Sequence, residues 1–99
     1  MTPEECNDAL EEQRKAIDVI DREIVKLLNE RAKVVEVIGD LKQQAAMRVY
    51  EPKREELVFA NIRSGNCGPL KDDALKRIYE RIIDEMRTLQ RDRMAAPKL

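Results

Sequence analysis

Histidine and tryptophan are absent from this 99-residue sequence, and serine occurs once, as Ser64. Without an imidazole, a serine–histidine nucleophile is excluded. The two cysteines, Cys6 and Cys67, lie far apart in the sequence and form no CxxC pair. Because no imidazole is present to complete a zinc site, we expect neither a metal nor a catalytic thiol.

The sequence also lacks long apolar runs and an excess of one charge. No segment approaches the roughly 20 apolar residues that a bilayer span requires, and the acidic start lacks the apolar centre of a signal peptide. The formal net charge is −1, with both signs interspersed. This pattern argues against nucleic-acid and membrane partners and predicts a soluble, cytoplasmic protein.

What remains is a mixture typical of long helices. Charged residues make up 39% of the chain and aromatic residues only 3%, a profile seen in helical bundles and coiled coils. The length suits one small domain over residues 1–99. We therefore predict an all-α fold of three helices in a single domain.

Hydrophobic periodicity and helix-end signals give the bounds of these helices. Proline suits a first helical turn, glycine a helix end and aspartate an N-cap. The predicted segments are about Leu10 to about Ala45, Pro52 to Ser64-Gly65, and a third helix from about Asp72 with a tail that frays from about Met94.

The first helix carries apolar residues at seven-residue spacing, as in helices that pack against other helices. The two series are Leu10, Ile17, Ile24, Arg31 and Ile38, and Gln13, Ile20, Leu27, Val34 and Leu41. Such a helix is roughly 50 Å long, whereas a compact chain of 100 residues has a radius of gyration of about 13 Å. Two shorter helices cannot cover this rod, so we predict an intertwined antiparallel homodimer. An extended monomer is the alternative.

Arg31 breaks the apolar series, because it occupies a core position with Leu27 and Val34 one turn away. A buried guanidinium needs an anionic partner, since an unpaired one is strongly destabilising. That partner is either an internal carboxylate, for example on the second helix, or a bound anion. The sequence leaves both alternatives open.

Lys42 and Arg14 share this ambiguity. Lys42 follows Arg31 by three helical turns, which places the two cations on one face about 16 Å apart at the backbone. A solvated lysine near a helix C-terminus is the alternative. Arg14 lies about 42 Å from Lys42 by helix rise and approaches it only if two first helices run antiparallel and cross near Ile24. Otherwise Arg14 is an exposed arginine paired with Asp18.

The second and third helices add further candidates. Arg54 stands in a first turn, where a cation opposes the helix dipole and favours a nearby anion. Glu55 is a candidate partner for Arg54 or Arg31. Gln90 continues an otherwise apolar row of the third helix, and a buried amide there needs hydrogen-bond partners. A surface position near the end of the helix is the alternative for Gln90.

The candidate residues and their neighbours form one ordered set that covers nearly the whole chain. They are Arg14, Ile17-Asp18, Ile20-Asp21, Ile24, Leu27-Leu28, Arg31, Ile38-Gly39 and Lys42, then Tyr50-Glu51-Pro52-Lys53-Arg54-Glu55-Glu56, then Ile82-Ile83 and Gln90. Together they resemble the all-helical chorismate mutases, from about Leu10 to Arg91. No single motif is decisive, but the combined set is specific.

The resemblance implies an isomerase that converts chorismate to prephenate without a cofactor, in a homodimer with two active sites. By this resemblance, Arg14 of the partner chain and Arg31 would bind the substrate carboxylates. Lys42 would contact the ether oxygen and a carboxylate, and Gln90 would donate a hydrogen bond to the ether oxygen. The rearrangement is unimolecular, so these groups need only orient the substrate and stabilise developing charge.

The second helix supplies the remaining residues that the resemblance implies. Arg54 would add positive charge near the carboxylates, and Glu55, together with Glu51, would accept the hydrogen bond of the ring hydroxyl. Two positions depart from the family pattern. Glu51 stands where aspartate is frequent, and Met86 stands where some members have a small polar residue, so we expect no carboxylate contact from that turn.

Two rival functions remain. An isochorismate–pyruvate lyase shares this scaffold, and the start Thr2-Pro3-Glu4-Glu5-Cys6 mildly resembles that group, whereas the run Arg54-Glu55-Glu56 looks more like a mutase. A noncatalytic helical dimer, acting as an adaptor or regulatory module, would need only the heptad repeats.

Overall fold

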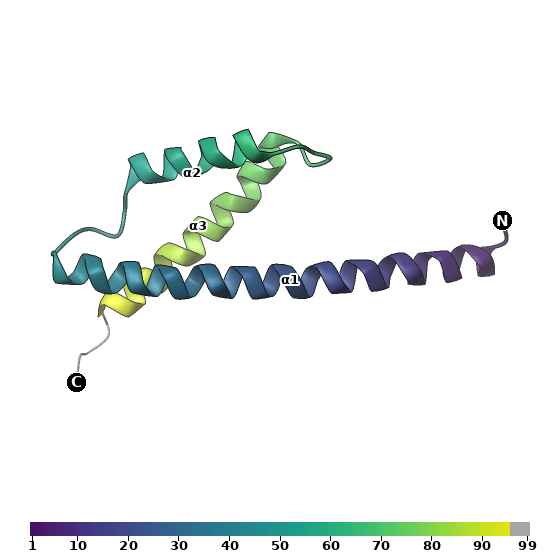
Figure 1. Ribbon diagram of the computed structural model, residues 1–99, viewed down its shortest axis with the longest axis horizontal. Coiled ribbons are helices and arrows are strands. Elements are labelled where there is room, and N and C mark those ends of the chain that lie inside the picture. Colours follow the sequence, from purple (N-terminus) through teal and green to yellow (C-terminus); the bar gives the residue numbers. More distant parts are fainter. Residues whose placement is uncertain (96–99) are drawn as a thin grey trace. The chain divides into compact units, whose positions relative to one another are not determined.

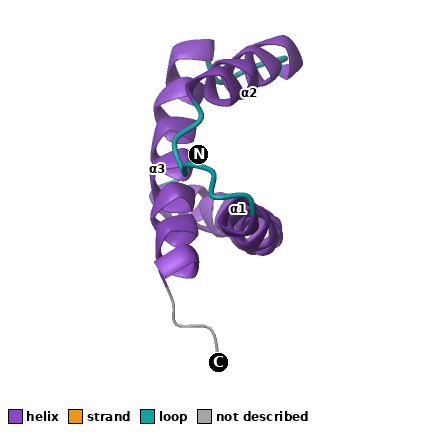
Figure 2. Cartoon of the chain, turned by 90° about the vertical axis from the view of Figure 1, so that its left-hand side faces the viewer, coloured by secondary structure: helices purple, strands orange, loops and turns teal. Residues whose placement is uncertain are grey.

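The computed structural model describes residues 1–95, which form three α-helices (Figure 1). These are α1 (Pro3–Gln44), α2 (Pro52–Gly65) and α3 (Asp72–Ala95). Residues 1–95 contain no strand (Figure 2), so the predicted three-helix, all-α fold is confirmed. None of the described helices is long and apolar enough to cross a membrane. The chain divides within α1 into two compact units, which begin at Met1 and Val34 and are described in turn.

The first unit begins with a helix start that differs from the predicted one. α1 starts at Pro3, whereas the hydrophobic repeat predicted a start near Leu10. The backbone N–H of Glu5 donates to Thr2 Oγ1 over 3.1 Å, and the backbone N–H of Thr2 donates to Glu5 Oε2 over 3.4 Å. This is a capping box, which satisfies helix-end donors and extends the helix beyond its apolar repeat.

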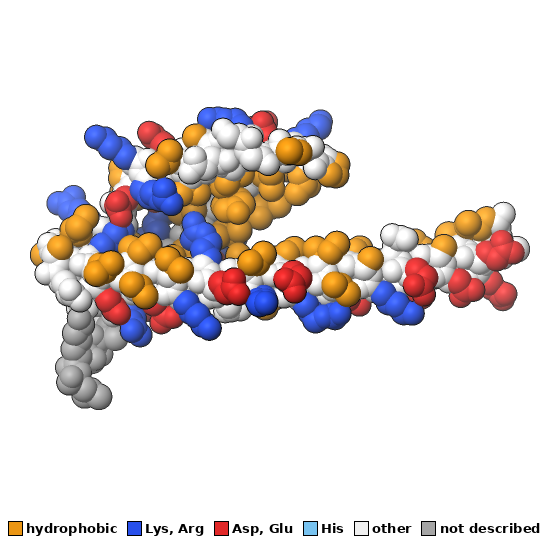
Figure 3. Space-filling view, viewed as in Figure 1, with side chains coloured by type: hydrophobic (Ala, Val, Ile, Leu, Met, Phe, Trp, Pro, Cys, Tyr) orange, Lys and Arg blue, Asp and Glu red, His pale blue; other side chains and the backbone are white. Residues whose placement is uncertain are grey.

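The apolar repeat of α1 is largely uncovered in the single chain. Figure 3 shows hydrophobic side chains following the helix. The exposed apolar members of the two series are Leu10, Ile17, Ile20, Ile24, Leu27, Val34, Ile38 and Leu41. Apolar side chains in such a contiguous row mark a surface that another protein surface covers.

The second unit contains the end of α1, which closes with a Schellman turn. The backbone N–H of Met47 donates to the carbonyl of Lys42 over 2.8 Å, and that of Ala46 donates to Gln43 over 3.3 Å. Ala46 has a positive φ of 54°, the left-handed conformation that this turn requires. The turn directs the chain back so that Val49 lies beside the Lys42 side chain.

The buried apolar core of the second unit is small. Among residues 34–95 it comprises Val35 on α1 and Ile83 on α3. Gly39 allows close approach, because a Cβ built there would lie 3.3 Å from Gln90 Cγ. Beyond this core, Arg93 pairs with Asp40 at 3.1 Å.

α3 continues through Ala95, whereas the sequence predicted fraying from about Met94. The Gln43 side chain donates from Nε2 to the carbonyl of Met94 over 2.8 Å, which holds this last turn. Ala96 and Pro97, the rest of the tail predicted to fray, lie outside the described residues. The predicted start at Asp72 and the bounds of α2 are confirmed.

The close approach at Gly39 generates a stability prediction. Valine at this position should lower the free energy of unfolding by about 1–3 kcal/mol, because its methyl groups would displace Gln90 and separate α1 from α3. Gly65→Val is the matched control, since a Cβ at Gly65 meets nothing within 4 Å. Chemical denaturation of both variants checks the prediction, and equal stability changes would contradict it.

Candidate functional site

Lys42 is the centre of the candidate site. Its side chain is buried, with 6% of the residue exposed. The ammonium has three oxygen atoms around it. It donates hydrogen bonds to the carbonyl of Val49 at 2.9 Å and to Gln90 Oε1 at 2.7 Å, and it forms an ion pair with Glu51 Oε1 at 2.6 Å. These oxygens come from the turn after α1, from α3 and from the residue before α2, so one cation joins three parts of the unit.

Gln90 is oriented by this contact. It is 7% exposed, and its oxygen accepts from an ammonium that can only donate. The amide nitrogen of Gln90 therefore points away from Lys42. Among the described residues, this nitrogen donates no hydrogen bond to another side chain or carbonyl. The arrangement provides a buried amide with donors available to a ligand.

Glu51 is the most accessible partner of Lys42. It is the N-cap residue of α2, yet its carboxylate makes no capping hydrogen bond to the helix. The carboxylate pairs with Lys42 instead, and its side chain remains 43% exposed. Of the three acceptors around the ammonium, Glu51 is thus the one that a ligand oxygen can replace with the least rearrangement.

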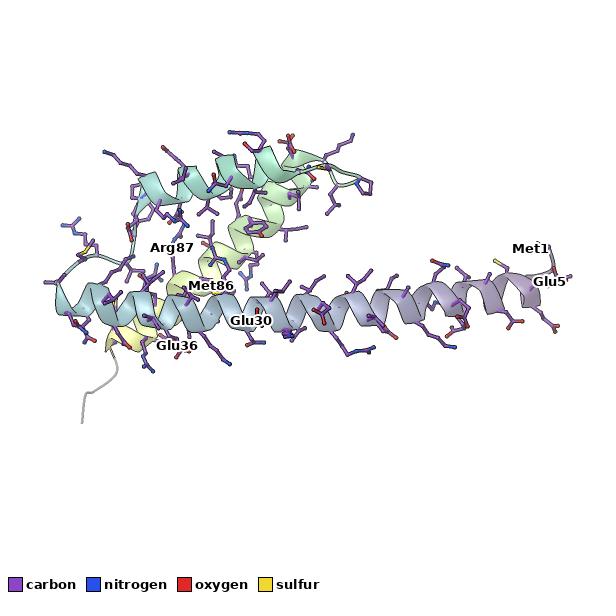
Figure 4. The ribbon with its side chains drawn as sticks, viewed as in Figure 1. Met1, Glu5, Glu30, Glu36, Met86 and Arg87 are labelled. Atoms are coloured by element: carbon purple, nitrogen blue, oxygen red, sulfur yellow. The ribbon has the colours of Figure 1, made fainter. Side chains whose placement is uncertain are left out.

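A second charged cluster lies one helical turn away. Arg87, labelled in Figure 4, lies on α3. It binds both carboxylate oxygens of Glu55 on α2, with Nε 2.9 Å from Oε2 and a further contact from the second terminal nitrogen to Oε1. Arg87 also donates to Asp84 over 3.0 Å and lies 5.4 Å from the ring centre of Tyr50. The hydrogen bonds to Glu55 raise the pKa of Arg87 above its ordinary value, although burial opposes this.

The two clusters share the same faces of α2 and α3. Glu51 and Glu55 are four residues apart, and Arg87 and Gln90 are three apart. Residues at these separations are neighbours along one side of a helix. A row of alternating partners therefore runs between the helices, with the Lys42–Glu51 pair followed by the Glu55–Arg87 pair.

The other predicted cations are not part of this row. Arg54 is exposed in the first turn of α2 and has no ion pair among residues 34–95. Arg14, in the first unit, is exposed and pairs with Glu11 at 2.6 Å, so the alternative of an exposed arginine is right for the single chain but its expected partner Asp18 is wrong. Arg31 is half-buried and makes no ion pair within residues 1–33.

Burial decides two alternatives that the sequence left open. Lys42 is not a solvated lysine, and Gln90 is not a surface residue, because both are buried and bonded to each other. Sequence reasoning missed Arg87. The available signals were its position three residues before Gln90 and the need of Glu55 for a cation. The heptad repeat lies on α1 and carries no information about the partners of charges on α3.

Comparison with known proteins points to one family. The model of the family described as "Chorismate mutase type II" matches residues 13–91. A bifunctional chorismate mutase/prephenate dehydratase of Neisseria gonorrhoeae is 44% identical over 78 residues, which are 79% of this chain and 21% of that protein. The chain thus spans about a fifth of that relative's length. A chorismate mutase of Methanocaldococcus jannaschii is 29% identical, with 85% of this chain and 86% of that protein covered.

Solved structures agree with this assignment. Form II of the chorismate mutase of Thermus thermophilus superimposes with a TM-score of 0.82 at 32% identity, over 84% of this chain and 94% of that one. The chorismate mutase of Helicobacter pylori in complex with prephenate gives a TM-score of 0.85 at 26% identity, over 92% and 99% of the two chains. With its three helices and its match over residues 13–91, the chain belongs to the chorismate mutase type II family.

Proposed function

We propose that this chain is an isomerase that rearranges chorismate to prephenate in a site shared by two copies of the chain. The observation that carries the proposal is the buried Lys42–Gln90 pair, 2.7 Å between Nζ and Oε1. It presents an oriented ammonium and an oriented neutral amide side by side. Such a pair suits a unimolecular rearrangement, because this reaction requires charge stabilisation but no nucleophile and no proton transfer.

The proposed reaction sets two tasks. The first is to fold a flexible dianion into the reactive conformation. Because the bound substrate is already ordered, the entropic part of the activation free energy becomes smaller. The second is to stabilise negative charge that develops on the breaking ether oxygen. A donor that is already fixed before the substrate arrives stabilises that charge without reorganisation, and losing one such donor typically lowers turnover by about 100- to 1,000-fold.

Lys42 and Gln90 serve the second task in this proposal. The substrate would replace Glu51, the exposed partner of Lys42, and leave Val49 and Gln90 to hold the ammonium. The amide nitrogen of Gln90, turned away from Lys42, would then donate to the ether oxygen. Since an amide donates at every pH, this contact would need no protonation step.

The arginines serve the first task. Arg31 has no ion pair within residues 1–33, and Arg54 has none within residues 34–95. A dicarboxylate ligand would supply partners, and arginine binds carboxylates with two parallel hydrogen bonds. Arg14 is exposed on α1 and would reach the ligand from the partner subunit. Glu55 would accept the hydrogen bond of the ring hydroxyl.

The exposed apolar row of α1 supports the homodimer. Burying one leucine or isoleucine side chain contributes about 1.5–3 kcal/mol, and eight apolar residues of the two heptad series are exposed. A second copy of α1 running antiparallel has the same row at the same spacing, so it is the simplest cover. Cytoplasmic location stays a prediction of the sequence.

The rival functions have less support. The matching family is described by the mutase name, and so is the structure with prephenate, which disfavours the isochorismate–pyruvate lyase. An adaptor without catalysis would have no use for a buried ammonium and amide joined to each other, since replacing buried polar pairs by apolar residues is often neutral or stabilising.

Replacing Arg31 by alanine tests the proposal. We expect kcat/KM for chorismate to fall by about 100-fold or more, because truncating one member of a desolvated charge pair costs roughly 2–5 kcal/mol. Turnover is measured by the absorbance of chorismate and by chromatography of prephenate, with isochorismate as a second substrate. Arg22→Ala is the matched control, since Arg22 is an exposed cation on the same helix.

Three outcomes of this experiment would count against the proposal. Unchanged turnover in Arg31→Ala would remove Arg31 from the site. Wild-type protein that consumes neither substrate would favour an adaptor. Salicylate and pyruvate formed from isochorismate, without prephenate from chorismate, would favour the lyase. Sedimentation of each variant shows that the dimer survives the substitution.

Mixing two inactive variants tests the shared site. Arg14→Ala and Lys42→Ala homodimers should each be nearly inactive. After unfolding and joint refolding at equal amounts, half of the dimers are mixed, and each mixed dimer has one intact site if Arg14 acts across the interface. Turnover should therefore return to about a quarter of the wild-type value. Mixtures no more active than the separate variants would show that Arg14 does not act in the partner's site.

A further inference from the structure

Arg87 is held from several directions at once. Its guanidinium contacts both oxygens of Glu55, donates to Asp84 over 3.0 Å and lies 5.4 Å from the ring centre of Tyr50. The side chains of Arg87 and Glu55 are 27% and 19% exposed. These contacts join α3, α2 and the segment before α2. A guanidinium restrained in this way is itself a rigid support.

The contact with Arg87 fixes both the position of the Glu55 negative charge and the plane of its carboxylate. Two parallel hydrogen bonds from one guanidinium align the carboxylate with the fork of the arginine. Each carboxylate oxygen has two acceptor sites, so each keeps one for another donor. The Glu55 carboxylate is thus oriented and still able to accept a hydrogen bond.

Arg87 also balances charge where a dianion is expected to bind. A carboxylate within several ångströms of two substrate carboxylates repels them, and this repulsion is strong where water is excluded. Arg87 compensates the charge of Glu55, and its second acidic partner, Asp84, is 55% exposed and therefore screened by water. The pairing keeps the acceptor for a hydroxyl while removing most of the repulsion.

The position of the pair suits this role. Glu55 follows Glu51 by one turn of α2, and Arg87 precedes Gln90 by one turn of α3. The oriented carboxylate is therefore a neighbour, along the same two helix faces, of the groups proposed to act on the ether oxygen.

We propose that Arg87 is a positioning residue that orients Glu55 to accept the hydrogen bond of the substrate's ring hydroxyl, and so sets the preference for a hydroxylated ring. The inference rests on the proposed function, because it needs a ring hydroxyl at Glu55. Arg87 acts through Glu55 and has no contact of its own with the reacting atoms in this account.

The test compares two substrates, chorismate and its analogue that lacks the ring hydroxyl. In Arg87→Met, kcat/KM for chorismate should fall by roughly tenfold or more, which is the effect of losing a hydrogen bond to a charged group. For the analogue it should change by less than about threefold, since no hydroxyl is present to be bound. The ratio of the two values is the readout that a purely structural ion pair would not move.

Two further variants keep the test informative. Arg87→Lys retains the charge without the two-point contact, so its ratio should fall between those of the wild type and Arg87→Met. Arg93→Met is the matched control, because Arg93 on α3 also pairs with acids on another helix, Asp40 and Glu36. It should lower stability without changing the ratio. If Arg87→Met does not fold, the ratio of kcat/KM for the two substrates in Arg87→Lys alone tests the inference.

A wild-type ratio in both Arg87 variants would overturn the inference while leaving the proposed function intact, provided that the wild-type protein converts chorismate. Equal losses for both substrates would also overturn it, since they would indicate a general structural role. A wild-type protein without mutase activity would overturn both proposals together.

Discussion

The buried ammonium of Lys42 is the constraint around which the second unit is arranged. A charge taken out of water is destabilising unless it is paired and hydrogen-bonded, and Lys42 has two hydrogen bonds and one ion pair. Satisfying it requires the turn after α1 to bring Val49 back, α2 to start directly after Glu51, and α3 to pass close enough for Gln90 to bond. The left-handed conformation of Ala46 and the missing side chain of Gly39 make these approaches sterically feasible.

This constraint explains why charged groups lie between the helices where apolar packing would stabilise the unit more simply. The Lys42–Glu51 ion pair joins α1 to the residue before α2, and the Arg87–Glu55 ion pair joins α3 to α2, while Val35 and Ile83 are the only buried apolar residues among residues 34–95. The single chain therefore has little apolar burial and a long exposed apolar row on α1. In the proposed dimer, α1 of the partner subunit would bury the exposed apolar row and would also bring Arg14 to the substrate. Folding, association and substrate binding would then depend on the same helix.

The sequence was sufficient for the helices and for most of their bounds, because heptad spacing, Pro52 and Asp72 are local signals. It missed the start of α1, since the Thr2–Glu5 capping box lies outside the apolar repeat. It singled out Lys42 and Gln90 as residues that break a pattern, but their contact joins residues 48 positions apart, which periodicity cannot show. Arg87 looks like an ordinary surface arginine until the packing of α2 against α3 brings it to Glu55. The roles of Arg14, Arg31 and Arg54 toward a ligand stay predictions.

A crystal structure with a stable bicyclic mimic of the transition state bound is the most direct test of the central claim, that preset cationic and amide donors from two chains surround one small dianion. We expect Lys42 and Gln90 at the ether oxygen of the mimic, and its carboxylates bound by Arg31 of the same chain and Arg14 of the partner subunit. A structure in which Arg31 pairs with an internal carboxylate, and in which no ligand lies between it and Lys42, would contradict it.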